Sequence, residues 1–164
     1  MKKTVTIVAV ALIALCFANK LLAMSARKPP VSLLVVPARY TIIQVGRDIV
    51  AKRPAAMVSY REGAPADEAM YVWNGGSWIP ITIEDFETTA FLRRRPDKVV
   101  IVGRPGKPRT KMLADAASWC PRIEIVSEME TTGLLNRLGE IFNFSQTEWF
   151  WFANRYKREL KVVN

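Results

Sequence analysis

The sequence of 164 residues contains no histidine. This absence removes the most common general acid–base side chain and the most common metal ligand. Cysteine is scarce, with Cys16 in an apolar leader and Cys120 alone in the remainder of the chain. We therefore expect no disulfide framework and no zinc site, and Cys120 is expected to be a small buried side chain. No residue is assigned a catalytic role, and no cofactor or metal is expected.

Nucleotide-binding signatures are also missing. There is no G-x-G-x-x-G, and the glycines in 103–111 are too closely spaced for a P-loop, with Pro108 where that motif has Ser or Thr. Positive charge is less dominant than it first appears. The net charge is +9, but five of the 24 cations and none of the 15 acids lie in residues 1–28. The composition therefore argues against a nucleic-acid partner.

The N-terminus is typical of an exported or membrane-anchored chain. Lys2 and Lys3 precede an uninterrupted apolar run of 15 residues, 4–18. As a helix this run would span about 22 Å, less than the roughly 30 Å core of a bilayer. We expect residues 1–26 to be either a cleaved signal peptide or a single transmembrane anchor, and 27–30 to be a short tether. Either alternative predicts the cell envelope, with the chain membrane-anchored or secreted to the periplasm or beyond, and a membrane as partner through this segment.

Residues 31–164 are expected to form a single α/β domain that ends in an aromatic amphipathic helix. Apolar, β-branched runs predict buried strands, and they alternate with amphipathic helical patterns. The predicted strands are 31–36, 55–60, 99–102 and 123–126. Two further short runs, 70–73 and 78–81, flank Asn-Gly-Gly-Ser and predict a β-hairpin. The fold class is therefore α/β: a three-layer, mostly parallel, Rossmann-like sheet of about four to five strands with a β-hairpin insertion, preceded by an N-terminal hydrophobic helix.

Helix boundaries are predicted from capping residues. Thr82 is expected to cap a helix, with Asp85 completing a capping box, and that helix is expected to end at 93–96. Thr110 is expected to cap the next helix. The final helix is expected to start near Thr147 and to bury an apolar stripe that reaches Leu160.

The segment 103–111 is a candidate anion site. It follows a buried strand and leads into a helix, and ligands of open α/β sheets usually bind at that edge. Backbone N–H groups at a helix start and nearby cations suit phosphate or carboxylate, although a solvated basic turn has the same pattern. Loops after the first and second strands add two arginines. The candidate ligand-binding residues are Arg39, Arg61, Arg104, Lys107, Arg109 and Lys111.

A second candidate surface is aromatic. The two tryptophans beside the hairpin turn either pair across the strands or make an exposed contact with a partner. The last helix has more aromatic side chains than one packing face needs, with cations following, which is typical of an interfacial helix but also of packing on the domain. The candidate partner or membrane surface comprises Trp73, Trp78, Phe150, Trp151, Arg155 and Arg158. The run 93–95 either complements the dipole of the preceding helix or faces anionic lipid headgroups.

Residues 84–126 resemble the cell-wall-binding type 2 repeat. The likeness rests on a helix, then Pro-Asp-Lys-Val-Val-Ile-Val-Gly at 96–103, then a helix and Arg122-Ile123. Arg104 replaces the family's second glycine, and tandem copies are absent. The resemblance covers about a quarter of the chain and implies a role in the cell envelope.

Together these features favour a cell-envelope protein, membrane-tethered or exported, with a non-catalytic α/β binding or assembly domain. The expected partner is a protein or a surface polymer. The alternative is an envelope enzyme that acts on an anionic or phosphorylated substrate at the C-terminal edge of the sheet.

Overall fold

The computed structural model describes residues 32–63, 65 and 68–161. The expected signal peptide or anchor (1–26) and the tether (27–30) lie outside these residues. Within the described part of the chain, no helix is both long enough and apolar enough to span a bilayer.

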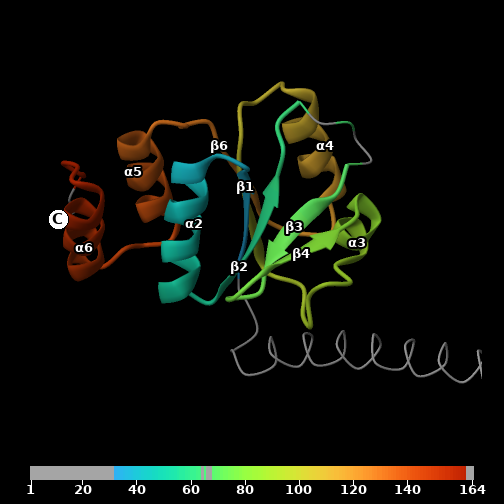
Figure 1. The fold of residues 1–164 in the computed structure, drawn as a ribbon, viewed down its shortest axis with the longest axis horizontal. Helices are drawn as coiled ribbons and strands as arrows, with labels where there is room; N and C mark the ends of the chain where they lie inside the picture. The colour runs from blue at the N-terminus through green and yellow to red at the C-terminus, as the bar shows by residue number, and fades with distance from the viewer. Residues whose placement is uncertain (1–31, 64, 66–67, 162–164) are drawn as a thin grey trace, which may run out of the picture.

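The described strands form one six-stranded mixed sheet in the order β4-β3-β2-β1-β5-β6 (Figure 1). The strands are β1 (Ser32–Pro37), β2 (Ala55–Tyr60), β3 (Met70–Trp73), β4 (Trp78–Ile81), β5 (Lys98–Val102) and β6 (Ile123–Val126). Strands β2, β1, β5 and β6 pair in parallel, whereas β3 is antiparallel to β2 and β4 to β3. The α/β class is confirmed. The predicted number of strands was too low because the hairpin is no separate insertion: it pairs with β2 and continues the same sheet.

Helices cover both faces of the sheet (Figure 1). The described helices are α2 (Tyr40–Lys52), α3 (Ile83–Thr88), α4 (Pro108–Ala116), α5 (Thr131–Ile141) and α6 (Gln146–Tyr156). Helices α2, α5 and α6 pack on one face, and α3 and α4 pack on the other. Because the helices occupy the two faces, the connections at the ends of the strands lie at the two edges of the layered structure.

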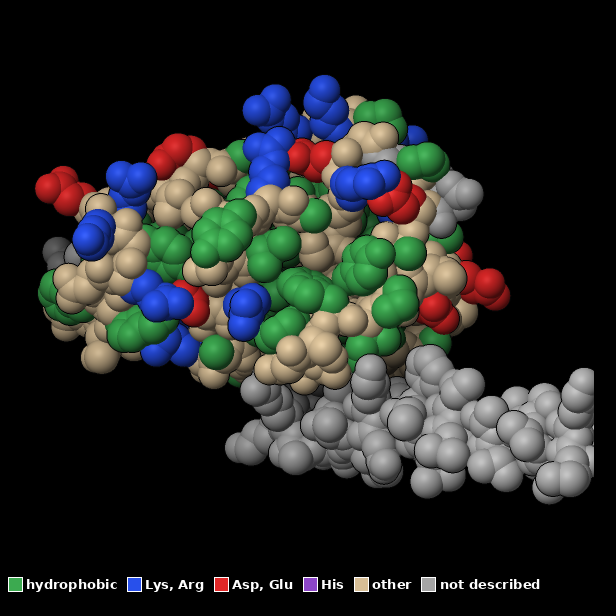
Figure 2. Space-filling view, viewed as in Figure 1, with side chains coloured by type: hydrophobic (Ala, Val, Ile, Leu, Met, Phe, Trp, Pro, Cys, Tyr) green, Lys and Arg blue, Asp and Glu red, His purple; other side chains and the backbone are tan. Residues whose placement is uncertain are grey.

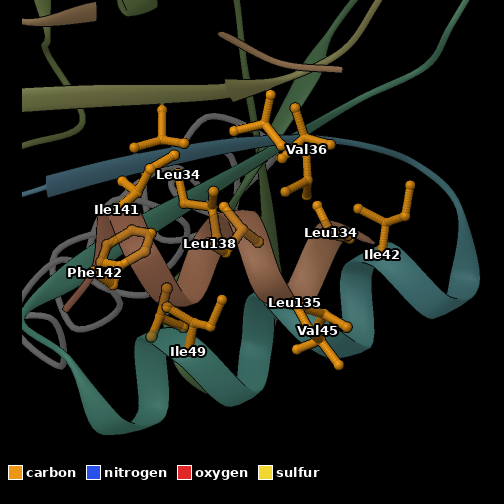
Figure 3. Packing of buried hydrophobic residues seen from close by; sticks show 14 of the residues in the cluster. Leu34, Val36, Ile42, Val45, Ile49, Leu134, Leu135, Leu138, Ile141 and Phe142 are labelled. Carbon is orange, nitrogen blue, oxygen red and sulfur yellow. The ribbon is translucent and has the colours of Figure 1, made fainter. Parts of the chain in front are cut away.

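Strand β1 shows why this sequence folds as a layered sheet. Its side chains alternate between the two faces, so both sets must be apolar to be buried. Leu34 and Val36 face α2 and α5 (Figure 3), while Leu33 and Val35 belong to the core beneath α3 and α4. All four side chains are fully buried.

The two outer strands differ. Pro80 lies in β4, opposite Tyr71, and has no N–H to offer a neighbouring strand. Strand β6 carries no proline, and Ile125 on it is 39% exposed.

Two helices end earlier than the sequence predicts. The capping box of Thr82 and Asp85 is present, but α3 ends at Thr88 because Thr89 adopts a left-handed φ of 59°. The arginines 93–95 therefore lie beyond the last turn of α3. Helix α6 ends at Tyr156, where Lys157 has a φ of 51°, so Leu160 follows the helix instead of extending its stripe.

The start of α4 is also earlier than expected. Lys107 is the N-cap residue and Pro108 occupies the first turn. Proline is favoured there because its missing N–H has no helical partner. Thr110 is 3% exposed inside the first turn and is no cap.

The packing of α5 on α6 predicts a strong steric effect at Gly139. A Cβ atom there would lie 2.1 Å from Cη2 of Trp149, which is 1% exposed. We expect Gly139→Ala to lower the free energy of unfolding by about 1–2 kcal/mol, because overpacking exceeds the gain of about 1 kcal/mol in helix propensity. Chemical denaturation measures this loss. Gly76→Ala is the control, since its nearest neighbour, Oδ1 of Asn74, would be 3.9 Å away; equal stability of the two variants would contradict the prediction.

Candidate functional site

The sheet has a switch in connectivity between β1 and β5. From β1 the chain crosses through α2 to β2 on one side, and from β5 it crosses through α4 to β6 on the other. Helices α2 and α4 lie on opposite faces. Ligands of open α/β sheets bind where such crossovers diverge, at the carboxyl ends of the strands. We call the connections at these ends, 38–39, 61–69, 103–107 and 127–130, the carboxyl edge.

A tight turn between β5 and α4 brings two cations together at this edge. The Lys107 N–H donates to the carbonyl of Arg104 (3.2 Å), and Gly106 has a φ of 81°. Pro105 and Gly106 occupy the second and third positions, as in a type II turn, whose end Cα atoms lie within about 7 Å. Neither the Arg104 nor the Lys107 side chain has an ion-pair or hydrogen-bond partner among the described residues. Figure 2 shows Lys and Arg side chains gathered over this edge.

Two helices also point their positive ends at the switch. Arg39 is the N-cap residue of α2 and Lys107 that of α4. Neither side chain caps its helix, and neither helix has an acidic residue in its first turn. Because helix N-termini carry partial positive charge, cations at these positions add to a potential that favours an anion.

The remaining predicted ligand residues have different surroundings. Arg39 forms an ion pair with Glu62 (2.5 Å) and Arg61 forms one with Glu68 (2.6 Å). Lys111 lies 3.9 Å from Asp115 on the exposed side of α4. All three cations are exposed, so these pairs hold them weakly.

Arg109 differs from the other candidates because it is only 6% exposed. Its guanidinium donates to the carbonyls of Pro65 (2.8 Å) and Glu68 (2.9 Å). These bonds tie the connection after β2 to α4. Arg109 therefore shapes the edge from beneath, while Arg104 and Lys107 project from it.

Buried side chains fill the space beside the end of β5. The Tyr60 hydroxyl donates to the Val102 carbonyl (2.8 Å), and Tyr60 is 1% exposed. A Cβ atom at Gly103 would meet Thr110 Oγ1 at 2.6 Å and the Tyr60 hydroxyl at 2.7 Å. An anion would therefore contact the exposed ends of the cations instead of entering the sheet at this point.

Tyr40 was not among the predicted site residues. It is the first residue of α2, directly after Arg39, and it is 79% exposed. The only hint in the sequence is an aromatic residue between the proline that ends β1 and the apolar stripe of α2. Its ring adds a flat apolar surface beside the cations.

The second candidate surface lies around α2. Trp73 and Trp78 are cross-strand partners with ring centroids 5.2 Å apart, so they staple the hairpin. The Arg47 guanidinium stacks on Trp73 at 4.3 Å. A pocket of about 240 Å³ lies between α2, the hairpin and α6, and its lining includes Trp73 and Arg155. Figure 2 shows apolar side chains gathered on this face, between α2 and the hairpin.

Helix α6 contributes to the same surface. Arg155 donates to Asp48 of α2 (2.5 Å), and Trp151 lies beside α2 with Lys52 3.9 Å from its ring centroid. Phe150 is 54% exposed on α6, and Arg158 is exposed beyond the helix end. The structure thus brings Trp73, Trp151 and Arg155 close to α2.

Comparison with protein-family models found no match, and searches of curated proteins and of solved structures found no significant similarity. The resemblance of residues 84–126 to cell-wall-binding repeats gains no support from these comparisons. Among the described residues, no group of three or more Cys, Asp or Glu side chains is arranged to hold a metal ion.

The Tyr60 hydroxyl gives a prediction about alkaline stability. Burial raises the pKa of Tyr60 above its usual value of 10.0. The protonated Tyr60 hydroxyl therefore contributes fully to the free energy of unfolding below about pH 10. This contribution is lost as pH rises towards the folded-state pKa, because the unfolded chain releases the proton first. We expect Tyr60→Phe to lose about 1 kcal/mol at neutral pH, through the missing hydrogen bond, and the gap from wild type to narrow above pH 10.

Urea denaturation from pH 7 to pH 11 measures both effects. Tyr71→Phe removes a hydroxyl from an exposed ring and is the control. A constant gap between Tyr60→Phe and wild type across this range would contradict the assignment.

Proposed function

We propose that this chain is a cell-envelope protein, membrane-tethered or exported, whose α/β domain binds an anionic group of a protein or surface polymer without catalysing a reaction. The binding site is the carboxyl edge at the switch between β1 and β5. Phosphate and carboxylate are the anions that guanidinium, ammonium and helix N–H groups recognise.

The observation that carries this proposal is the turn Arg104–Lys107. It brings the backbones of Arg104 and Lys107 close together at the start of α4, and neither side chain has an ion-pair or hydrogen-bond partner among the described residues. Two unpartnered cations on one short turn raise the local positive potential, which favours an anion. Arg39, at the start of α2, adds a third cation at the same switch.

Binding is favoured over the enzymatic alternative because Glu62, Glu68 and Glu130 of this edge already accept hydrogen bonds from arginines or from the start of α5. Glu62 and Glu68 accept from Arg39 and Arg61. A general base should instead have a carboxylate turned towards the bound substrate. The enzymatic alternative uses the same anion site and differs only in that the bound substrate would be converted to product.

Reversing the two unpaired cations tests the site. The full chain in neutral detergent is titrated calorimetrically with inorganic phosphate and with a short polyphosphate. We expect Arg104→Glu with Lys107→Glu to weaken binding by at least about tenfold, because each charge-assisted hydrogen bond contributes about 1.5–3 kcal/mol.

Arg93→Glu with Arg94→Glu is the matched control, since it makes the same change in net charge far from the turn. The control should bind like wild type. An equal loss in both variants would indicate non-specific attraction and would overturn the proposed site. Release of orthophosphate from the polyphosphate would favour the enzymatic alternative.

A further inference from the structure

The opposite edge of the sheet has its own chemistry. Strands β1, β2, β5 and β6 all begin there, at Ser32, Ala55, Lys98 and Ile123. The connections that form it are 53–54, 89–97, 117–122 and 142–145, together with the hairpin turn 74–77; we call them, with Lys52 at the end of α2, the amino edge. Figure 1 shows the connection between α3 and β5 reaching past the strand starts on this side.

The positive charge of the domain is concentrated at the amino edge. These connections contain five cations and one acid, whereas those of the carboxyl edge contain four cations and five acids. With Lys52 at the end of α2, the cations of the amino edge are Lys52, Arg53, Arg93, Arg94, Arg95 and Arg122. The acid is Asp97. A surface with this imbalance attracts an extended anionic partner.

Most of these cations are free to meet such a partner. The Arg53 guanidinium donates hydrogen bonds to the carbonyl of Asn143 and to the carboxylate of Glu148. The other five are exposed, and Arg93, Arg94 and Arg122 have no side-chain partner among the described residues. Arg95 donates to Oγ1 of Thr89 (3.4 Å), the C-cap residue of α3, whereas Arg93 and Arg94 have no such contact, so the end of that helix accounts for only one arginine of the run.

Half-buried tryptophans lie among the cations. Arg95 lies 6.0 Å from the ring centroid of Trp119, and Lys52 lies 3.9 Å from that of Trp151. The Trp73–Trp78 pair borders the hairpin turn, opposite the start of β2. Tryptophan beside lysine or arginine is the combination enriched at the boundary between lipid headgroups and acyl chains.

Chain length brings this edge to a membrane. The expected membrane anchor comprises residues 1–26, and β1 begins at Ser32. The five intervening residues can span at most about 18 Å in any conformation. Since β1 lies in the middle of the sheet, an anchored chain must hold the centre of the amino edge close to the bilayer surface.

We propose that the amino edge docks on the anionic lipid headgroups of the membrane that receives the N-terminal segment. This inference rests on the membrane link of the proposed function, in its anchored form. Docking turns the carboxyl edge, with Arg104 and Lys107, away from the bilayer, where it meets soluble or polymeric partners.

The test uses the full chain reconstituted into vesicles that contain a nitroxide-headgroup lipid, with either phosphatidylcholine alone or added phosphatidylglycerol. Co-flotation reports the membrane link, and quenching of intrinsic tryptophan fluorescence reports docking. We expect stronger quenching with phosphatidylglycerol and its loss in high salt.

Arg93→Glu with Arg94→Glu should reduce quenching to the level seen in phosphatidylcholine alone. The four units of charge removed correspond to more than about a hundredfold in surface partitioning, at about fivefold per unit. Arg104→Glu with Lys107→Glu makes the same charge change at the other edge and should leave quenching unchanged.

The outcomes separate the two proposals. Flotation with quenching that ignores phosphatidylglycerol, or that falls equally in both variants, overturns docking and leaves the membrane link intact. Failure of the chain to float overturns the membrane link and docking with it.

Discussion

The burial of β1 on both faces, between two parallel neighbours, is the constraint on which the structure depends. Leu33 and Val35 require one helical layer, and Leu34 and Val36 require the other. Parallel pairing with β2 and β5 then forces each connection to cross the sheet, so all four parallel strands begin at one edge and end at the other. The two edges are therefore chemically independent surfaces, and the exposed cations of each can be altered without disturbing the core between them.

Local patterns in the sequence predicted most of the elements. Strand β2 and both hairpin strands have the predicted bounds, because β-branched runs and Asn-Gly turns act over a few residues. The capping box of Thr82 and Asp85 is equally local. Strand order depends on contacts between distant segments, and so did the extension of the sheet by the hairpin. The end of α3 at Thr89 was missed because a left-handed threonine has no strong sequence signal.

The candidate site shows the same division. A cationic turn after a buried strand was visible in the sequence. Parallel pairing of β1 with β2 and β5 places Arg39, Arg61 and Arg104 at one edge, which the sequence could not settle without the strand order. The sequence could not distinguish Arg109 from its neighbours. Its bonds reach the carbonyls of Pro65 and Glu68, more than forty positions away, so burial separates a structural arginine from exposed ones. Tyr40 was missed because exposure, which depends on the whole fold, is its distinguishing property.

The unequal outer strands of the sheet limit how copies of this domain could associate through their backbones. Pro80 interrupts the row of donors along β4, whereas β6 keeps its donors and an exposed isoleucine. A second copy could therefore add a strand beside β6 but not beside β4. Two molecules joined β6 to β6 would form a closed pair with β4 at both ends, and no third copy could extend the sheet. The proline therefore guards the domain against fibrous polymerisation through its sheet edges.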